Sequence, residues 1–72
     1  MKKRIIKKLD EMRVECLKQK RAYLEWIDIY RMHNMVDQEI LNTLLSRVAR
    51  YDDRAYLLKR IIIKISKEYF ED

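Results

Sequence analysis

Glycine and proline are both absent from the 72 residues of this chain. Average composition would supply roughly nine of the two together at this length. Glycine provides the positive φ angles of tight turns, and proline ends helices because it lacks a backbone N–H and clashes with the preceding turn. A chain without either residue has few turns and little that interrupts a helix. The sequence therefore favours an all-α fold of long helices.

An apolar pattern with alternating steps of three and four residues runs through the second half of the chain. It continues for about four heptads, and this period is typical of a helix that packs one face on another helix. Its members are Leu41, Leu44, Val48, Tyr51, Ala55, Leu58, Ile62, Ile65 and Tyr69.

The first half carries the same spacing, so it also predicts a helix with one packing face. A single member, Gln19, is polar, and a polar residue at such a position can specify the register of packed helices. The members are Ile5, Leu9, Met12, Cys16, Gln19, Tyr23, Trp26 and Tyr30.

The segment between the two patterns contains residues suited to a turn. Asn34 tolerates the left-handed conformation that ends many helices, and Asp37 is a good N-cap for a following helix. We therefore expect helices over about 3–33 and 38–70, joined by a turn at about 34–37. Because the connection is short, the helices are expected to be antiparallel neighbours in a coiled-coil-like hairpin that forms a single domain.

Asp52 and Asp53 offer an alternative architecture. Aspartate caps helices well but is a mediocre interior residue, so a break here would divide the second helix and produce a three-helix bundle. The spacing of three and four runs through Tyr51 and Ala55 without a change of phase. We therefore favour one uninterrupted helix.

The second helix carries more apolar surface than one partner helix can cover. A further row repeats every seven residues, about 100° around the helix from the first pattern. Apolar patches of this kind usually mark an interface, so we expect a homodimer that forms a four-helix bundle, or docking on a different protein. The candidate interface residues are Leu45, Ala49, Tyr56, Ile63 and Phe70, with Ile27 from the first helix.

The formal net charge of +5 comes from the first third of the chain. Lysine and arginine in the segment 2–21 could contact phosphates, which makes a small basic nucleic-acid-binding regulator the alternative function. These charges lie all around the predicted helix, and no helix-turn-helix or zinc-ligand pattern accompanies them. The candidate nucleic-acid residues are Lys7, Lys8, Arg13, Lys18, Lys20 and Arg21.

Motifs for catalysis are missing from the sequence. There is no phosphate loop, no nucleophile–base pair and no metal motif, and His33 is the only histidine. One cysteine fits a reducing, cytoplasmic setting, and no apolar run approaches the roughly 20 residues of a membrane span. We expect no cofactor, metal or small-molecule substrate and no membrane binding. The leading hypothesis is a non-enzymatic interaction protein, a regulator, inhibitor or adaptor that docks a helix face on a protein partner.

Overall fold

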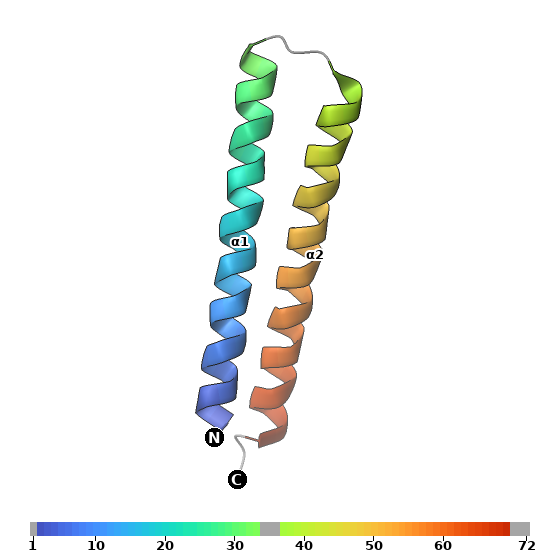
Figure 1. The fold of residues 1–72 in the computed structure, drawn as a ribbon. Helices are drawn as coiled ribbons and strands as arrows, with labels where there is room; N and C mark the ends of the chain where they lie inside the picture. Colours follow the sequence, from blue (N-terminus) through green and yellow to red (C-terminus); the bar gives the residue numbers. More distant parts are fainter. Residues whose placement is uncertain (1, 34–36, 70–72) are drawn as a thin grey trace.

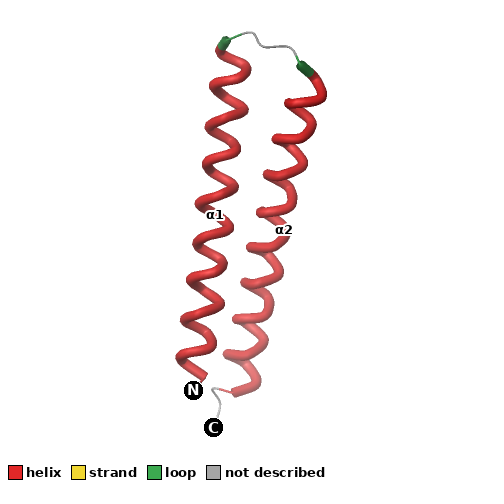
Figure 2. The backbone as a smooth tube through the Cα atoms, viewed as in Figure 1, coloured by secondary structure: helices red, strands yellow, loops and turns green. Residues whose placement is uncertain are grey.

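The computed structural model of the chain describes residues 2–33 and 37–69. Two helices, α1 (Lys2–Met32) and α2 (Gln38–Tyr69), account for nearly all of them. The helices run antiparallel and pack side by side (Figure 1), and the tube in Figure 2 shows that each is continuous. The predicted all-α hairpin is confirmed, with helix ends within one residue of those expected.

The start of α2 is capped as the sequence predicts. The Asp37 carboxylate oxygen Oδ1 accepts hydrogen bonds from the backbone N–H groups of Glu39 at 3.0 Å and Ile40 at 3.3 Å. The backbone N–H of Asp37 donates to the Tyr30 hydroxyl at 3.0 Å, which ties the end of α1 to the start of α2. Asn34, the residue expected to form the turn, lies outside the described residues.

The alternative of a helix break at Asp52 and Asp53 is wrong, because α2 is continuous from Gln38 to Tyr69. The Asp52 carboxylate does not cap a helix. It accepts a hydrogen bond from the Lys20 ammonium group of α1 at 2.7 Å, and this ion pair joins the two helices at mid-length.

The packing face of α2 agrees with the predicted pattern. All of its members with described side chains are buried or half-buried, and Ala55 and Leu58 form a core cluster with Cys16 of α1. The side chain of Tyr69, the last member, lies outside the described part of the chain. Steps of three and four residues therefore located this face correctly.

The packing face of α1 is rotated by about 50° from the predicted one, because half of its members shift by one residue, or 100°. Residues 9, 16, 23 and 30 face α2 as expected, but 6, 13, 20 and 27 replace 5, 12, 19 and 26 as their companions. Ile27 is 3% exposed, whereas Trp26, predicted to pack, is 62% exposed. The rotation brings Ile27 between the helices and places Lys20 within reach of Asp52.

Candidate interaction faces

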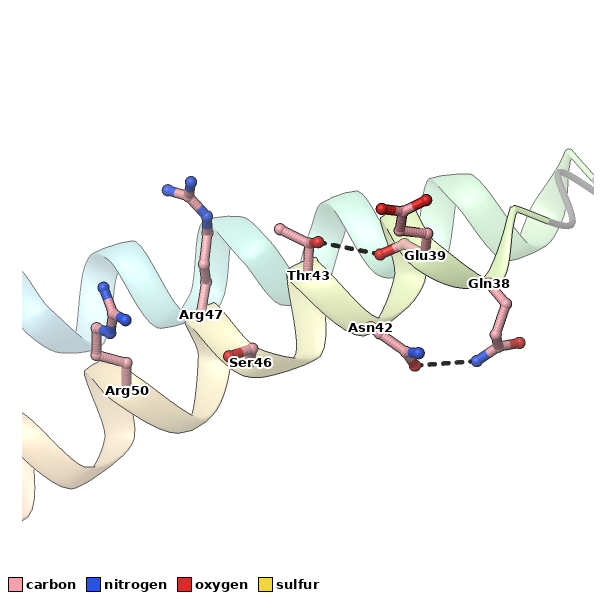
Figure 3. Close-up of a pocket in the computed structure, with 7 residues that line it drawn as sticks. All are labelled: Gln38, Glu39, Asn42, Thr43, Ser46, Arg47 and Arg50. Carbon is pink, nitrogen blue, oxygen red and sulfur yellow. Dashed lines mark hydrogen bonds between the residues drawn. The ribbon is translucent and has the colours of Figure 1, made fainter.

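A polar hollow of about 600 Å³ lies along the first turns of α2. Figure 3 shows that all the side chains that line the hollow come from α2, and that the side chains of Arg47 and Arg50 extend away from the axis of this helix. Neighbouring polar groups bond along the helix, with Gln38 Nε2 donating to Asn42 Oδ1 at 3.0 Å. Because the hollow has no opposite wall, these groups do not converge on a point where a substrate could be held. The lining residues are Gln38, Glu39, Asn42, Thr43, Ser46, Arg47 and Arg50.

Metal-ligating side chains do not cluster in the part of the chain that the structure describes. Within residues 2–33 and 37–69, no group of three or more His, Cys, Asp or Glu side chains could hold a metal ion. Cys16 is buried against Ala55 and Leu58, where a free thiol packs as a small apolar group. Gln19, the polar residue of the predicted packing face, is half-buried and its Nε2 donates to Glu15 Oε1 at 3.1 Å.

Neither helix, over the residues described, has a stretch both long and apolar enough to cross a membrane.

Aromatic and polar contacts join the helices near their middle. The rings of Tyr23 and Tyr51 stack with centroids 5.9 Å apart and an interplanar angle of 19°. Arg47 Nη1 donates to the Tyr23 hydroxyl at 3.2 Å, and its guanidinium carbon lies 5.7 Å from the centre of the same ring. These contacts make Tyr23 and Tyr51 part of the interhelical packing.

Two helices packed side by side expose two broad faces. We call the positions of each helix that face the other helix its interhelical positions. Each residue turns 100° around the helix. A residue directly after an interhelical position therefore lies on one broad face, and a residue directly before such a position lies on the other. Leu17 and Tyr56 line one hollow across the two helices, and Met12 and Arg54 line another. We name the face with the first hollow the Tyr56 face. We name the face with the second hollow the Trp26 face, because Trp26 directly precedes the interhelical residue Ile27.

The Tyr56 face brings together four of the residues that the sequence proposed for an interface. Leu45, Ala49, Tyr56 and Ile63 are all exposed there. Ile27 does not belong to this face, because it is buried between the helices, and Phe70 lies outside the described residues. The interface residues proposed from the sequence do not include the α1 side chains of the face, which follow interhelical positions 13, 16 and 23; they are Val14, Leu17 and Leu24.

The Trp26 face is equally apolar but differs in charge. Its only carboxylate among the described side chains is Glu15. Its five cationic side chains are Lys8, Arg47, Arg50, Arg54 and Lys64, and its apolar members are Ile5, Met12, Ala22, Trp26, Ile29, Ile40, Leu57 and Ile61. The sequence pattern had placed three of these apolar residues in the core, so the face was missed as a surface.

The six candidate nucleic-acid residues do not form one surface. Arg13 and Lys20 lie at interhelical positions, where Arg13 pairs with Asp10 at 2.9 Å and Lys20 with Asp52. The other four are exposed but divided between both broad faces and the outer edge of α1; they are Lys7, Lys8, Lys18 and Arg21.

The hairpin exposes far more surface than a compact protein of its mass. Its accessible surface is 6338 Å², and a compact chain of 9.0 kDa exposes about 4,850 Å². Its radius of gyration of 16.5 Å compares with about 11 Å for a compact domain of 72 residues. The two uncovered broad faces contribute to this difference.

Comparison of the chain with protein-family models, with curated proteins and with solved structures gives no match. The two faces and their chemistry are therefore the basis for assigning a function.

Proposed function

We propose that this protein is a non-enzymatic helical interaction protein, a regulator, inhibitor or adaptor, that acts by docking a helix face on a protein partner. We further propose that a second copy of the chain covers the Tyr56 face, so that two hairpins form a four-helix bundle.

The observation that carries the proposal is the imbalance between buried and exposed apolar side chains. Among the described residues, the buried core consists of Cys16, Ile27, Ala55 and Leu58 alone. Large apolar side chains are exposed along both helices, with Tyr56 at 61% and Trp26 at 62%. Apolar surface on this scale is covered in most soluble proteins, so it supports a function in association.

The amount of exposed surface supports a second copy of the chain as the partner that covers the Tyr56 face. The chain exposes roughly 1,500 Å² more than a compact chain of its mass. If each copy covers about half of that amount with its Tyr56 face, the interface totals about 1,500 Å², the size of a standard stable interface. A two-fold interface requires a surface complementary to itself.

The charges of the Tyr56 face suit such a self-complementary contact. Both ion pairs among the described residues involve its carboxylates, Asp10 with Arg13 and Asp52 with Lys20. The face also presents the carboxylate of Asp28 and the cation of Arg21, two helical turns apart on α1. Opposite charges can therefore meet across a two-fold axis, whereas the Trp26 face would oppose its five cations to another five.

The test is the mass of the protein in solution for the wild type and for Tyr56→Lys. The wild type is expected to sediment as a dimer, and the lysine is expected to weaken association at least tenfold because it places a charge within an apolar contact. Ser46→Lys, which adds the same charge on the outer edge of α2, is the matched control and should dimerise as the wild type does. A wild type that stays monomeric at high concentration would contradict the second-copy proposal.

Partner capture tests the wider proposal. Immobilised protein should retain a protein partner from native lysate after nuclease treatment, at a stoichiometry given by the mass of the complex. Retention that nuclease abolishes would instead support the nucleic-acid alternative.

A further inference from the structure

We propose that the Trp26 face binds an acidic amphipathic helix of a partner protein. The inference rests on the proposed function, in which a second copy covers the Tyr56 face and leaves the Trp26 face free. It names the partner chemistry that this second face fits.

A row of guanidinium groups provides the charge complementarity. Arg47, Arg50 and Arg54 lie one helical turn apart along α2, each immediately before an interhelical position. The row spans about 10 Å at 1.5 Å per residue. A helix that presents carboxylates at i, i+3 and i+7 has the same spacing, so one partner helix can address all three guanidinium groups.

The arginines are positioned to bind carboxylates from outside the chain. The Tyr23 hydroxyl and ring hold Arg47, with the hydroxyl accepting its Nη1 hydrogen bond at 3.2 Å. Neither Arg50 nor Arg54 has an ion-pair partner among the described residues, where the two ion pairs are formed by Arg13 and Lys20. Guanidinium groups bind carboxylates with two parallel hydrogen bonds, which favours a partner rich in Glu or Asp.

Apolar surface lies on the same face beside the arginine row. A hollow of about 440 Å³ opens between the helices, with Met12 of α1 and Arg54 of α2 among its lining residues. The buried side chain of Cys16 and the half-buried Tyr51 also line this hollow. Its remaining lining residues are polar, Glu15 and Gln19, and Gln19 Nε2 donates to Glu15 Oε1 at 3.1 Å. An apolar side chain of a docked helix can enter it while a neighbouring carboxylate meets Arg54.

The apolar side chains of the Trp26 face favour a protein helix over a nucleic acid as the partner. Phosphate contacts need only cations within reach, whereas aliphatic side chains gain from contact with other apolar surface. Met12, Leu57 and Ile61 are exposed aliphatic groups on this face, beside the cations. An amphipathic helix with an apolar stripe bordered by carboxylates satisfies both sets of groups, as in helix-in-groove recognition.

The probe is a synthetic amphipathic peptide with leucine at i, i+3, i+4 and i+7 and glutamate on both flanks. Trp26 is the only tryptophan of the chain, so its fluorescence reports binding at this face directly. The peptide is expected to shift the emission to the blue, because docking removes the exposed indole from water. The variant Arg47→Gln, Arg50→Gln, Arg54→Gln should bind about tenfold more weakly, because three exposed ion pairs, each weak by itself, are lost together.

The control variant Arg4→Gln, Lys18→Gln, Lys67→Gln removes the same charge from the outer edges and should bind as the wild type does. Arg50→Gln with Arg54→Gln, which leaves the contact between Arg47 and Tyr23 intact, serves if the triple variant loses helicity. The proposal is overturned if glutamines in place of the peptide's glutamates leave binding unchanged. Equal losses in the control variant, or tighter binding of a single-stranded oligonucleotide, would also overturn it.

Mass measurements on the same samples separate the two proposals. If the protein is a dimer but binds no acidic peptide, only the proposal of an acidic partner helix is contradicted. If the protein is a monomer and binds the peptide at the Trp26 face, only the proposal of a second copy is contradicted.

Discussion

Trp26 and Ile27 are neighbours in the chain with opposite environments. Two three-four patterns overlap in α1, and the sequence favours the one that contains Trp26 because its members are the more apolar. The structure uses the other pattern, which contains Arg13 and Lys20. Their long aliphatic stems can lie against apolar neighbours while the charged ends reach Asp10 and Asp52. Apolar periodicity could not predict this choice, because both flanks of α1 are apolar.

Ile27→Ala is expected to reduce the free energy of unfolding by about 2 kcal/mol or more, because it leaves a cavity at the most buried side chain of the core. Ile29→Ala, at an exposed position two residues later, should cost less than about 0.5 kcal/mol. Urea unfolding followed by circular dichroism, at one fixed chain concentration, measures both. If both variants lose the same free energy of unfolding, Ile27 is not a core residue of α1.

At the scale of the helices, α2 was predictable and the Trp26 face was not. Every interhelical position of α2 is apolar, and Asp37 marks its start, so pattern and cap agree. The four exposed apolar residues that α2 contributes to the Tyr56 face, Leu45, Ala49, Tyr56 and Ile63, were predictable for the same reason. The Trp26 face depends on the rotation of α1, which the interhelical pair of Lys20 and Asp52 accompanies. That pair joins residues 32 apart, beyond what local spacing can indicate.

Asp37→Ala tests how much the cap contributes to α2. The change leaves the backbone N–H groups of Glu39 and Ile40 without the carboxylate that accepts their hydrogen bonds. We expect a loss of about 1 kcal/mol in the free energy of unfolding. Asp37→Asn should retain most of the stability, since asparagine caps helices about as well as aspartate. If both variants unfold as the wild type does, the cap does not stabilise the hairpin.

At the scale of the whole molecule, the hairpin is a thin ribbon rather than a compact domain. Its Cα atoms extend over 57 × 14 × 12 Å, the thickness of a single layer of helices, so both broad faces are exposed to solvent. A single layer of two helices cannot bury an apolar core on both sides, and domains gain stability from packed layers. The stability of this chain is therefore expected to depend on what covers its faces. The Tyr56 face suits a second copy, and the Trp26 face suits an acidic partner.

Unfolding should therefore depend on chain concentration. If dimerisation and folding are coupled, each tenfold rise in concentration stabilises the dimer by about 1.4 kcal/mol, and the midpoint of urea unfolding rises with it. Tyr56→Lys should lower the midpoint and flatten this dependence, because it weakens the association that supplies it. Ser46→Lys should preserve the slope. A wild-type midpoint that stays constant across a hundredfold range of concentration would mean that the interhelical contacts of one hairpin, with Ile27 at their centre, are sufficient for folding.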